Sequence, residues 1–209
     1  MAIDAIQKDL LEKIADLHEV PQGAYNIRAN GSAAARNTTA NIDIVTKTDK
    51  PGIDIIIKPG TKNESVHIPV VISQTGHTEM VYNDFYIGEG ADVTIVAGCG
   101  IHNTGDSESR HDGIHTFYVG KNAKMRYVEK HYGAGDGNGI DVVQRHVCLR
   151  ECFTGQSADR FRVTAGCDFR HHTAIDPVQL HLGGNAVAED FSAIPDDGYG
   201  SLVAGGFNG

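Results

Sequence analysis

Hydrophobic and polar positions near the N-terminus follow the period of an α-helix. Apolar residues recur there at steps of three and four, so that one face of the helix is buried. This stripe predicts a helix over residues 2–18, and its members are Ile3, Ile6, Leu10, Leu11, Ile14 and Leu17. Pro21 ends it, because proline cannot continue the helical hydrogen bonds. The helix is either a docking element or, as we expect, a cover over an exposed sheet or the end of a stacked structure.

From Thr39 the pattern changes to short β-branched runs. Runs at residues 40–45, 53–57 and 66–72 are separated by turn-forming Gly, Pro and Asn residues. Their spacing predicts short strands joined by turns, and leaves a sandwich, a barrel and a β-solenoid open. Residues 24–38 hold one short strand-like piece and a Gly/Ser/Ala connector, so we expect a loop there.

One segment of the chain is repeated in a related form. Residues 85–97 are followed, 32 residues later, by the related residues 117–129. In each copy an apolar run stops at a glycine, Gly88 or Gly120; two turn-type residues and an alanine follow, and an alternating strand comes next. A fixed-period repeat of strand–turn–strand units favours stacked β-coils, because each coil buries its inward side chains against the next.

Composition narrows the class of protein further. The chain has 209 residues, 25 of them Gly, with no Trp, which suits tight turns and argues against a helical bundle. The net charge is −9 without a basic run, so nucleic acid is not an expected partner. No apolar stretch is long enough to span a membrane, and charge comes too early for a secretory signal. Four Cys without a disulfide framework indicate a reducing compartment, and we predict a cytoplasmic protein.

Several long stretches between about Leu10 and Gly137 carry a family resemblance. They include residues 25–31 (YNIRANG), 53–60 (IDIIIKPG), 93–103 (VTIVAGCGIHN), 111–120 (HDGIHTFYVG) and 127–133 (YVEKHYG). In these stretches the chain resembles SufB/SufD-type proteins, the scaffolds of the SUF iron–sulfur cluster assembly system, and most closely their shorter members from archaea and anaerobic bacteria.

The resemblance implies a fold, partners and a function. The implied fold is mainly β, a right-handed parallel β-helix (β-solenoid) flanked by helical segments. The implied partners are a SufC-type ATPase and a second SufB/SufD-type subunit, in a homodimer or a heterodimer. The implied role is that of a non-enzymatic scaffold, on which a transient iron–sulfur cluster is built for transfer to apo-proteins.

The resemblance stops near Gly139, and this divides the chain into three parts. We predict an N-terminal helix over residues 1–23, a β-helix core domain over 24–139, shorter than in the family, and a tail over 140–209. In the tail no Lys occurs and strand alternation is lost, so we expect it to be poorly ordered or irregular. The tail is either genuinely divergent or an out-of-frame product, which the nucleotide sequence around codons 135–145 decides.

Candidate ligands gather in the most family-like stretch. Cys99 and His102 (C-x-x-H) are candidates for binding a cofactor, and His111 and His115 for binding a metal. A thiolate with imidazoles suits iron–sulfur species or zinc, and positions i and i+4 of a strand face the same side. In the alternative interpretation, Cys99 is a small buried hydrophobe in the wall of a coil, and the histidines lie on the connecting loop.

Further pairs carry weaker signals. Glu129 and His131 share a face at i and i+2, as a carboxylate–imidazole pair for proton handling or metal binding, or as an ordinary cross-strand pair. The tail's Cys148, Cys152 and Cys167 fit no zinc-site spacing.

Three functions therefore stand beside one another. The leading prediction is the assembly scaffold. The alternatives are a carbohydrate-acting enzyme on a parallel β-helix, which needs charged residues aligned on one outer face, and a non-functional truncated fragment with an unprotected last coil.

Overall fold

The protein is mainly β, with a single helix in the part that is described. The computed structural model describes residues 3–15, 17–19 and 21–135, and beyond them the backbone of further strands. Those strands are β10 (Arg145–Cys152), β11 (Asp159–Phe169), β12 (Thr173–Ala174), β13 (Gln179–Gly183) and β14 (Phe191–Ile194). The helix, α1 (Ala5–Ala15), lies within the predicted span of residues 2–18.

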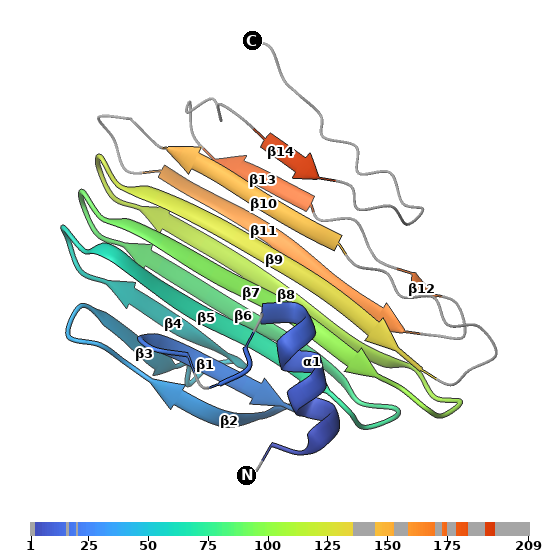
Figure 1. The fold of residues 1–209 in the computed structure, drawn as a ribbon. Coiled ribbons are helices and arrows are strands. Elements are labelled where there is room, and N and C mark those ends of the chain that lie inside the picture. Colours follow the sequence, from blue (N-terminus) through green and yellow to red (C-terminus); the bar gives the residue numbers. More distant parts are fainter. Residues whose placement is uncertain are drawn as a thin grey trace.

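Two stacked sheets form the body of the molecule (Figure 1). Sheet A has the strand order β14-β10-β9-β7-β5-β1-β2, and sheet B has the order β12-β11-β8-β6-β4-β3, with β13 also paired to β11. The N-terminal strands are β1 (Ala24–Ala29), β2 (Ser32–Asn37) and β3 (Ile42–Thr46). The central strands are β4 (Gly52–Ile57), β5 (Lys62–Ile72), β6 (Thr78–Ile87), β7 (Asp92–His102), β8 (Ser109–Val119) and β9 (Lys124–Ala134).

From β4 to β9 the chain alternates between the two sheets. We call the three consecutive strand pairs β4–β5, β6–β7 and β8–β9 rungs 1, 2 and 3. Each strand pairs in parallel with its counterpart in the next rung, so that Phe85 lies beside Phe117 and Val93 beside Met125. The repeat predicted from the sequence is therefore a structural repeat, because its two copies are neighbours in the same register.

The turns between the two strands of each rung also stack. Each turn is closed by an i+3 to i backbone hydrogen bond, such as Ala91 N to Gly88 O at 3.1 Å and Ala123 N to Gly120 O at 3.1 Å. Gly60, Gly90 and Asn122 occupy the third turn position with φ of 72°, 66° and 57°, as glycine and asparagine readily do.

Gly88 and Gly120 are needed for a different reason, since neither has a positive φ. A Cβ on Gly88 would lie 2.6 Å from the carbonyl carbon of Lys58, and one on Gly120 would lie 2.6 Å from the amide N of Glu89. The rungs approach so closely here that no side chain fits.

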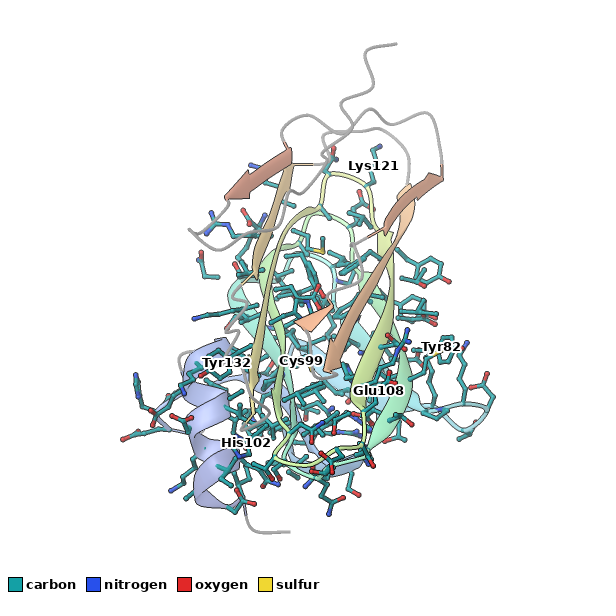
Figure 2. All side chains as sticks on the ribbon, turned by 90° about the vertical axis from the view of Figure 1, so that its right-hand side faces the viewer. Tyr82, Cys99, His102, Glu108, Lys121 and Tyr132 are labelled. Atoms are coloured by element: carbon teal, nitrogen blue, oxygen red, sulfur yellow. The ribbon has the colours of Figure 1, made fainter. Side chains whose placement is uncertain are left out.

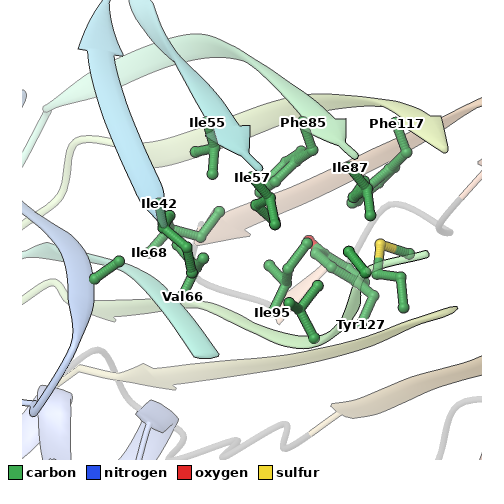
Figure 3. Close-up of a cluster of buried hydrophobic side chains, with 14 of the residues drawn as sticks. Ile42, Ile55, Ile57, Val66, Ile68, Phe85, Ile87, Ile95, Phe117 and Tyr127 are labelled. Carbon is green, nitrogen blue, oxygen red and sulfur yellow. The ribbon is translucent and has the colours of Figure 1, made fainter. Parts of the chain in front are cut away.

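The space between the sheets is filled by inward side chains (Figure 3). Phe85 and Phe117 stack with ring centroids 4.6 Å apart, and Tyr127 from sheet A meets Phe117 edge-on at 5.2 Å. All three are fully buried, and the burial of each such side chain contributes about 1.5–3 kcal/mol to the free energy of unfolding. This apolar part of the interior lies next to the stacked turns.

Helix α1 covers the outer face of sheet A over β5, β7 and β9 (Figure 1). Its N-terminus is capped reciprocally, since Asp4 Oδ1 accepts from Gln7 N at 2.8 Å and Gln7 Oε1 accepts from Asp4 N at 3.2 Å. Leu10 and Ile14 pack where Gly98 and Gly100 leave room on the strand. The prediction of a helix covering an exposed sheet agrees with this placement. No helix among the described residues is long and apolar enough to cross a bilayer.

Two regions differ from the sequence predictions. Residues 24–38 are not a loop: β1 and β2 form a hairpin around Asn30-Gly31, with φ of 47° and 77°, and Asn-Gly is a strong signal for such a turn. The described pieces of the tail are also strands and not irregular, because β10 and β11 pair antiparallel with β9 and β8. Backbone pairing to an open sheet edge needs no alternation of side chains.

We predict that Gly88→Ala lowers the free energy of unfolding by about 2–3 kcal/mol, because the new methyl group must push two rungs apart. The matched control is Gly90→Asn, since Asn122 occupies the equivalent position of rung 3 with φ 57°. The control should stay within about 0.5 kcal/mol of the original protein. Chemical denaturation measures both, and equal effects of the two substitutions would contradict the stacked-turn explanation.

Candidate functional site

The interior between the sheets becomes polar from rung to rung. Val70, Cys99 and His131 are direct lateral neighbours on the inner face of sheet A. On the inner face of sheet B, Ile53, Asn83 and His115 follow one another in the same way. Figure 2 shows Cys99 between the two layers, well inside the molecule, and its exposed fraction is 1%. We call each of these rows of lateral neighbours a column. In both columns the residue of rung 1 is apolar and the residue of rung 3 is a histidine.

His111 and His131 lie opposite each other across this interior. The His115 ring lies 5.9 Å from the Tyr127 ring, so these two residues face each other from β8 and β9. The two strands run in opposite directions away from the turn that joins them. Moving four residues further from that turn on each strand leads from this pair to His111 and His131, which are also both buried.

A chain of charged groups holds His111. Glu79 Oε1 lies 3.0 Å from His111 Nδ1, and Glu79 Oε2 accepts a hydrogen bond from Arg28 at 2.7 Å. Burial by itself raises the pKa of Glu79, but His111 and then Arg28 outweigh it and lower the pKa to about 2. Burial lowers the pKa of His111, whereas Cys99 and Glu79 raise it, and the net shift is upward. Glu79 is therefore a carboxylate that fixes the orientation of this imidazole.

His131 interacts with both Glu129 and Cys99. Its Nε2 lies 3.4 Å from Glu129 Oε1, and both side chains are almost completely buried. Burial by itself lowers the pKa of His131, but Glu129 and the Cys99 sulfur outweigh it and raise the pKa to about 10. Burial raises the pKa of Glu129, whereas His131 and His115 lower it, and the net shift is downward. The pair is thus an ion pair inside the protein, and the second oxygen of Glu129 makes no hydrogen bond of ordinary geometry among the described residues, although Glu129 also interacts with Tyr127.

His115 has a different environment. Its Nδ1 lies 3.5 Å from the amide nitrogen of Asn83, and its ring is 5.9 Å from Phe85. Burial lowers its pKa to about 4, and the attraction of Glu129 does not compensate for the loss of solvation. A Cβ on Gly113 would lie 2.6 Å from His115 Nε2, so Gly113 makes the room that the imidazole occupies.

The structure brings together only part of the predicted site. Cys99 and His111 belong to one cluster, and both His111 and His115 face inward from β8, so the alternative that places these histidines on the connecting loop is wrong. His102 is separate: it lies three positions beyond Cys99 on β7, and strand alternation puts it on the other face. His111 and His115 are also about 13 Å apart along the strand, too far to share one ion without large movements.

Sequence reasoning left Glu79, Arg28 and the Cys99–His131 pairing out of the site. The signal for His131 was present, since it alternates with Glu129 in the predicted strand. Nothing in the sequence pointed to Arg28 or Glu79, which come from β1 and β6. The tail residues Cys148, Cys152 and Cys167 have no described side chains, so they lie outside the part of the site that can be described.

The donor types suit a metal, although the described side chains are not yet in position to hold one. No three His, Cys, Asp or Glu residues of the described chain form a ready ion-binding group. One thiol, imidazoles and a carboxylate are nevertheless the donors that zinc and iron prefer.

The sequence matches no protein-family model, and no curated protein matches it.

We predict that protonation of His115 makes the fold sensitive to acid. Its pKa is near 6.5 in the unfolded chain and about 4 in the folded protein, so the unfolded chain takes up the proton first as the pH falls. The stability that neutral His115 contributes is therefore complete above pH 6.5 and is lost between pH 6.5 and 4.

The measurement is the change in the free energy of unfolding between pH 7 and pH 4.5. His115→Gln should make that change smaller by about 2–3 kcal/mol. His18→Gln is the control for replacing a histidine, because the His18 side chain is 77% exposed. An unaltered profile in His115→Gln would contradict the prediction.

Proposed function

We propose that this protein is a scaffold subunit for iron–sulfur cluster assembly that acts with a SufC-type ATPase in the cytoplasm. In this proposal the cluster is cargo, built on the protein and passed to apo-proteins, and the protein itself is not an enzyme. A second SufB/SufD-type subunit, identical or related, completes the assembly. The proposal begins from the resemblance of residues 10–137 to that family.

The strand topology supports the architecture that this proposal requires. Strands β4 to β9 alternate between two sheets, and each pairs in parallel with the strand two places further along the chain. Stacked turns with matching hydrogen bonds link the rungs at one edge. We propose that the core is a short parallel β-helix, right-handed as in the family.

The observation that carries the functional proposal is the environment of Cys99. This residue lies in the most family-like stretch, and its neighbours are His111 and His131 and not a purely apolar wall. A packing residue would need no buried charge beside it, because burying ionisable groups costs free energy unless they are paired. A thiol among imidazoles has the donors that iron–sulfur chemistry requires.

A carbohydrate-acting enzyme has less support. Such an enzyme needs aligned, available carboxylates on an outer face, and Asp54 and Asp84 are indeed neighbours on β4 and β6. Lys47, however, forms ion pairs with both, at 2.7 Å to Asp84. Burial lowers the pKa of Lys47, but the two carboxylates outweigh it and raise the pKa, so the three groups neutralise one another. A screen for activity on polyuronides tests this alternative directly.

We predict that anaerobic reconstitution with iron and sulfide produces a cluster chromophore that depends on Cys99. Cys99→Ala should reduce bound iron and sulfide several-fold, because the soft sulfur ligand is lost. The matched control is Val70→Ala, which shortens the buried neighbour of Cys99 in the same column and removes no donor. The control should keep its cluster.

Binding of a SufC-type ATPase, measured by co-purification, completes the test. A colourless protein that also fails to bind the ATPase would rule out the scaffold function. Aggregation of the purified chain in size-exclusion chromatography would instead favour a truncated, non-functional fragment.

A further inference from the structure

The contact between Glu129 and His131 has an unusual length for a buried ion pair. Charge-assisted N–H···O bonds are usually about 2.7–2.9 Å long, whereas Glu129 Oε1 and His131 Nε2 are 3.4 Å apart. Both residues are nine-tenths or more buried, so solvent does not explain the gap. When one oxygen and one nitrogen bind the same tetrahedral metal ion, each about 2.1 Å from it, these two donor atoms are about 3.4 Å apart. The pair is therefore a long hydrogen-bonded ion pair whose spacing also equals that of two ligands of one metal ion.

A second observation points to the same place. The other oxygen of Glu129 and the hydroxyl group of Tyr127 are buried and make no hydrogen bond of ordinary geometry in the described part of the chain, although the two residues interact with each other. A buried carboxylate oxygen without a full hydrogen bond is costly, and a bound cation is one of the ways in which proteins satisfy it.

We propose that Cys99, His111, Glu129 and His131 form an internal site for one divalent transition-metal ion of the zinc or ferrous-iron type. The site lies between the sheets in rungs 2 and 3, and it replaces the predicted pairings of Cys99 with His102 and of His111 with His115. Two of its donors, on Glu129 and His131, already have ligand spacing. Cys99 and His111 complete the set by rotation of their side chains, since Cys99 is the lateral neighbour of His131 and His111 faces it from sheet B.

Glu79 supports this site without binding the metal. A metal-bound imidazole commonly donates its other N–H to a carboxylate, which fixes the ring and increases its basicity. Glu79 Oε1 stands in this position, 3.0 Å from His111 Nδ1, and Arg28 holds the other oxygen. Nε2 of His111 is thereby left for the metal.

The charges and the geometry select the ion and the ligands. A thiolate and one carboxylate carry two negative charges, which neutralise a divalent cation in a low-dielectric interior. Mixed sulfur, nitrogen and oxygen donors favour zinc or iron over calcium or magnesium, which take oxygen ligands. His115 is excluded because it lies about 13 Å along the strand from His111 and contacts Asn83 instead.

The test uses the full-length protein, purified without oxygen and stripped of metal, and titrated with Co²⁺ as a spectroscopic substitute for zinc or iron. We expect one equivalent to bind and to produce thiolate-to-cobalt charge-transfer absorption. Cys99→Ser should abolish that absorption, and Glu129→Gln should weaken binding at least tenfold. Glu79→Gln should weaken it by about 10–100-fold, the usual effect of losing such a carboxylate.

Two controls keep the result specific. His102→Asn should not change the affinity, because His102 lies on the other face of β7, and Cys148→Ser should keep the charge-transfer absorption. Far-UV circular dichroism shows whether each variant is folded. If a variant does not fold, the original protein still provides a test in urea just below the unfolding midpoint, where the buried Cys99 thiol becomes reactive. Under these conditions Co²⁺ should slow the alkylation of Cys99, measured by mass spectrometry of the peptide that contains it.

Three results would each overturn the inference: no binding of Co²⁺, charge-transfer absorption that survives Cys99→Ser, or unchanged alkylation of Cys99. That the natural ion is iron rests on the proposed function. The binding test, however, uses neither sulfide nor ATPase. A protein that binds Co²⁺ at Cys99 but forms no cluster would support the metal site and contradict the scaffold function. A protein that forms a cluster but does not bind Co²⁺ would support the scaffold function and contradict the metal site.

Discussion

The register between rungs is the constraint on which the rest of this structure depends. Parallel pairing places each inward side chain directly beside its equivalent in the next rung, as Phe85 lies beside Phe117. The backbones come so close at the turns that Gly88 and Gly120 cannot carry a side chain. Because successive side chains of a strand point to opposite faces, a slip of one residue would turn every inward side chain outward and destroy the core. The fold therefore has one register in which both the core and the turns are satisfied.

The same register makes the polar interior possible. A column that is apolar in rung 1 can change its chemistry one residue at a time in later rungs without disturbing the backbone, as Val70 gives way to Cys99 and then to His131. Ionisable groups that enter the interior in this way must find partners there, since unpaired buried charge is expensive. The ion pair of Glu79 with Arg28 meets this requirement from strands that are distant in the sequence, and the pair of Glu129 with His131 meets it within β9.

Strand β7 connects the helix to this polar interior. On its outer face Gly98 and Gly100 let Leu10 and Ile14 of α1 pack against the strand, and on its inner face Cys99 joins the histidines. Lys13 extends the contact to rung 3, donating to the Tyr132 hydroxyl at 2.9 Å (Figure 2 shows Tyr132 beside the helix). Gln7 links the helix to the end of rung 1, because its Nε2 donates to Ser73 Oγ at 3.1 Å. One strand thus carries the candidate ligand and the surface that holds the N-terminal helix.

The sequence by itself determined the local elements and the repeat. Its three-and-four spacing identified α1, its β-branched runs identified the central strands, and its duplicated segment identified the stacking of rungs 2 and 3. The Asn30-Gly31 dipeptide also indicates a hairpin turn, although the residues around it suggested a loop. Only the tertiary structure decided which polar residues meet. His102 is three residues from Cys99 but on the opposite face, whereas His131 is 32 residues away and directly beside it. The spacing of residues within one strand predicts only which side chains share a face of that strand. Which residues of different strands meet in the interior depends on the pairing register and on the opposite sheet, and a short stretch of sequence shows neither.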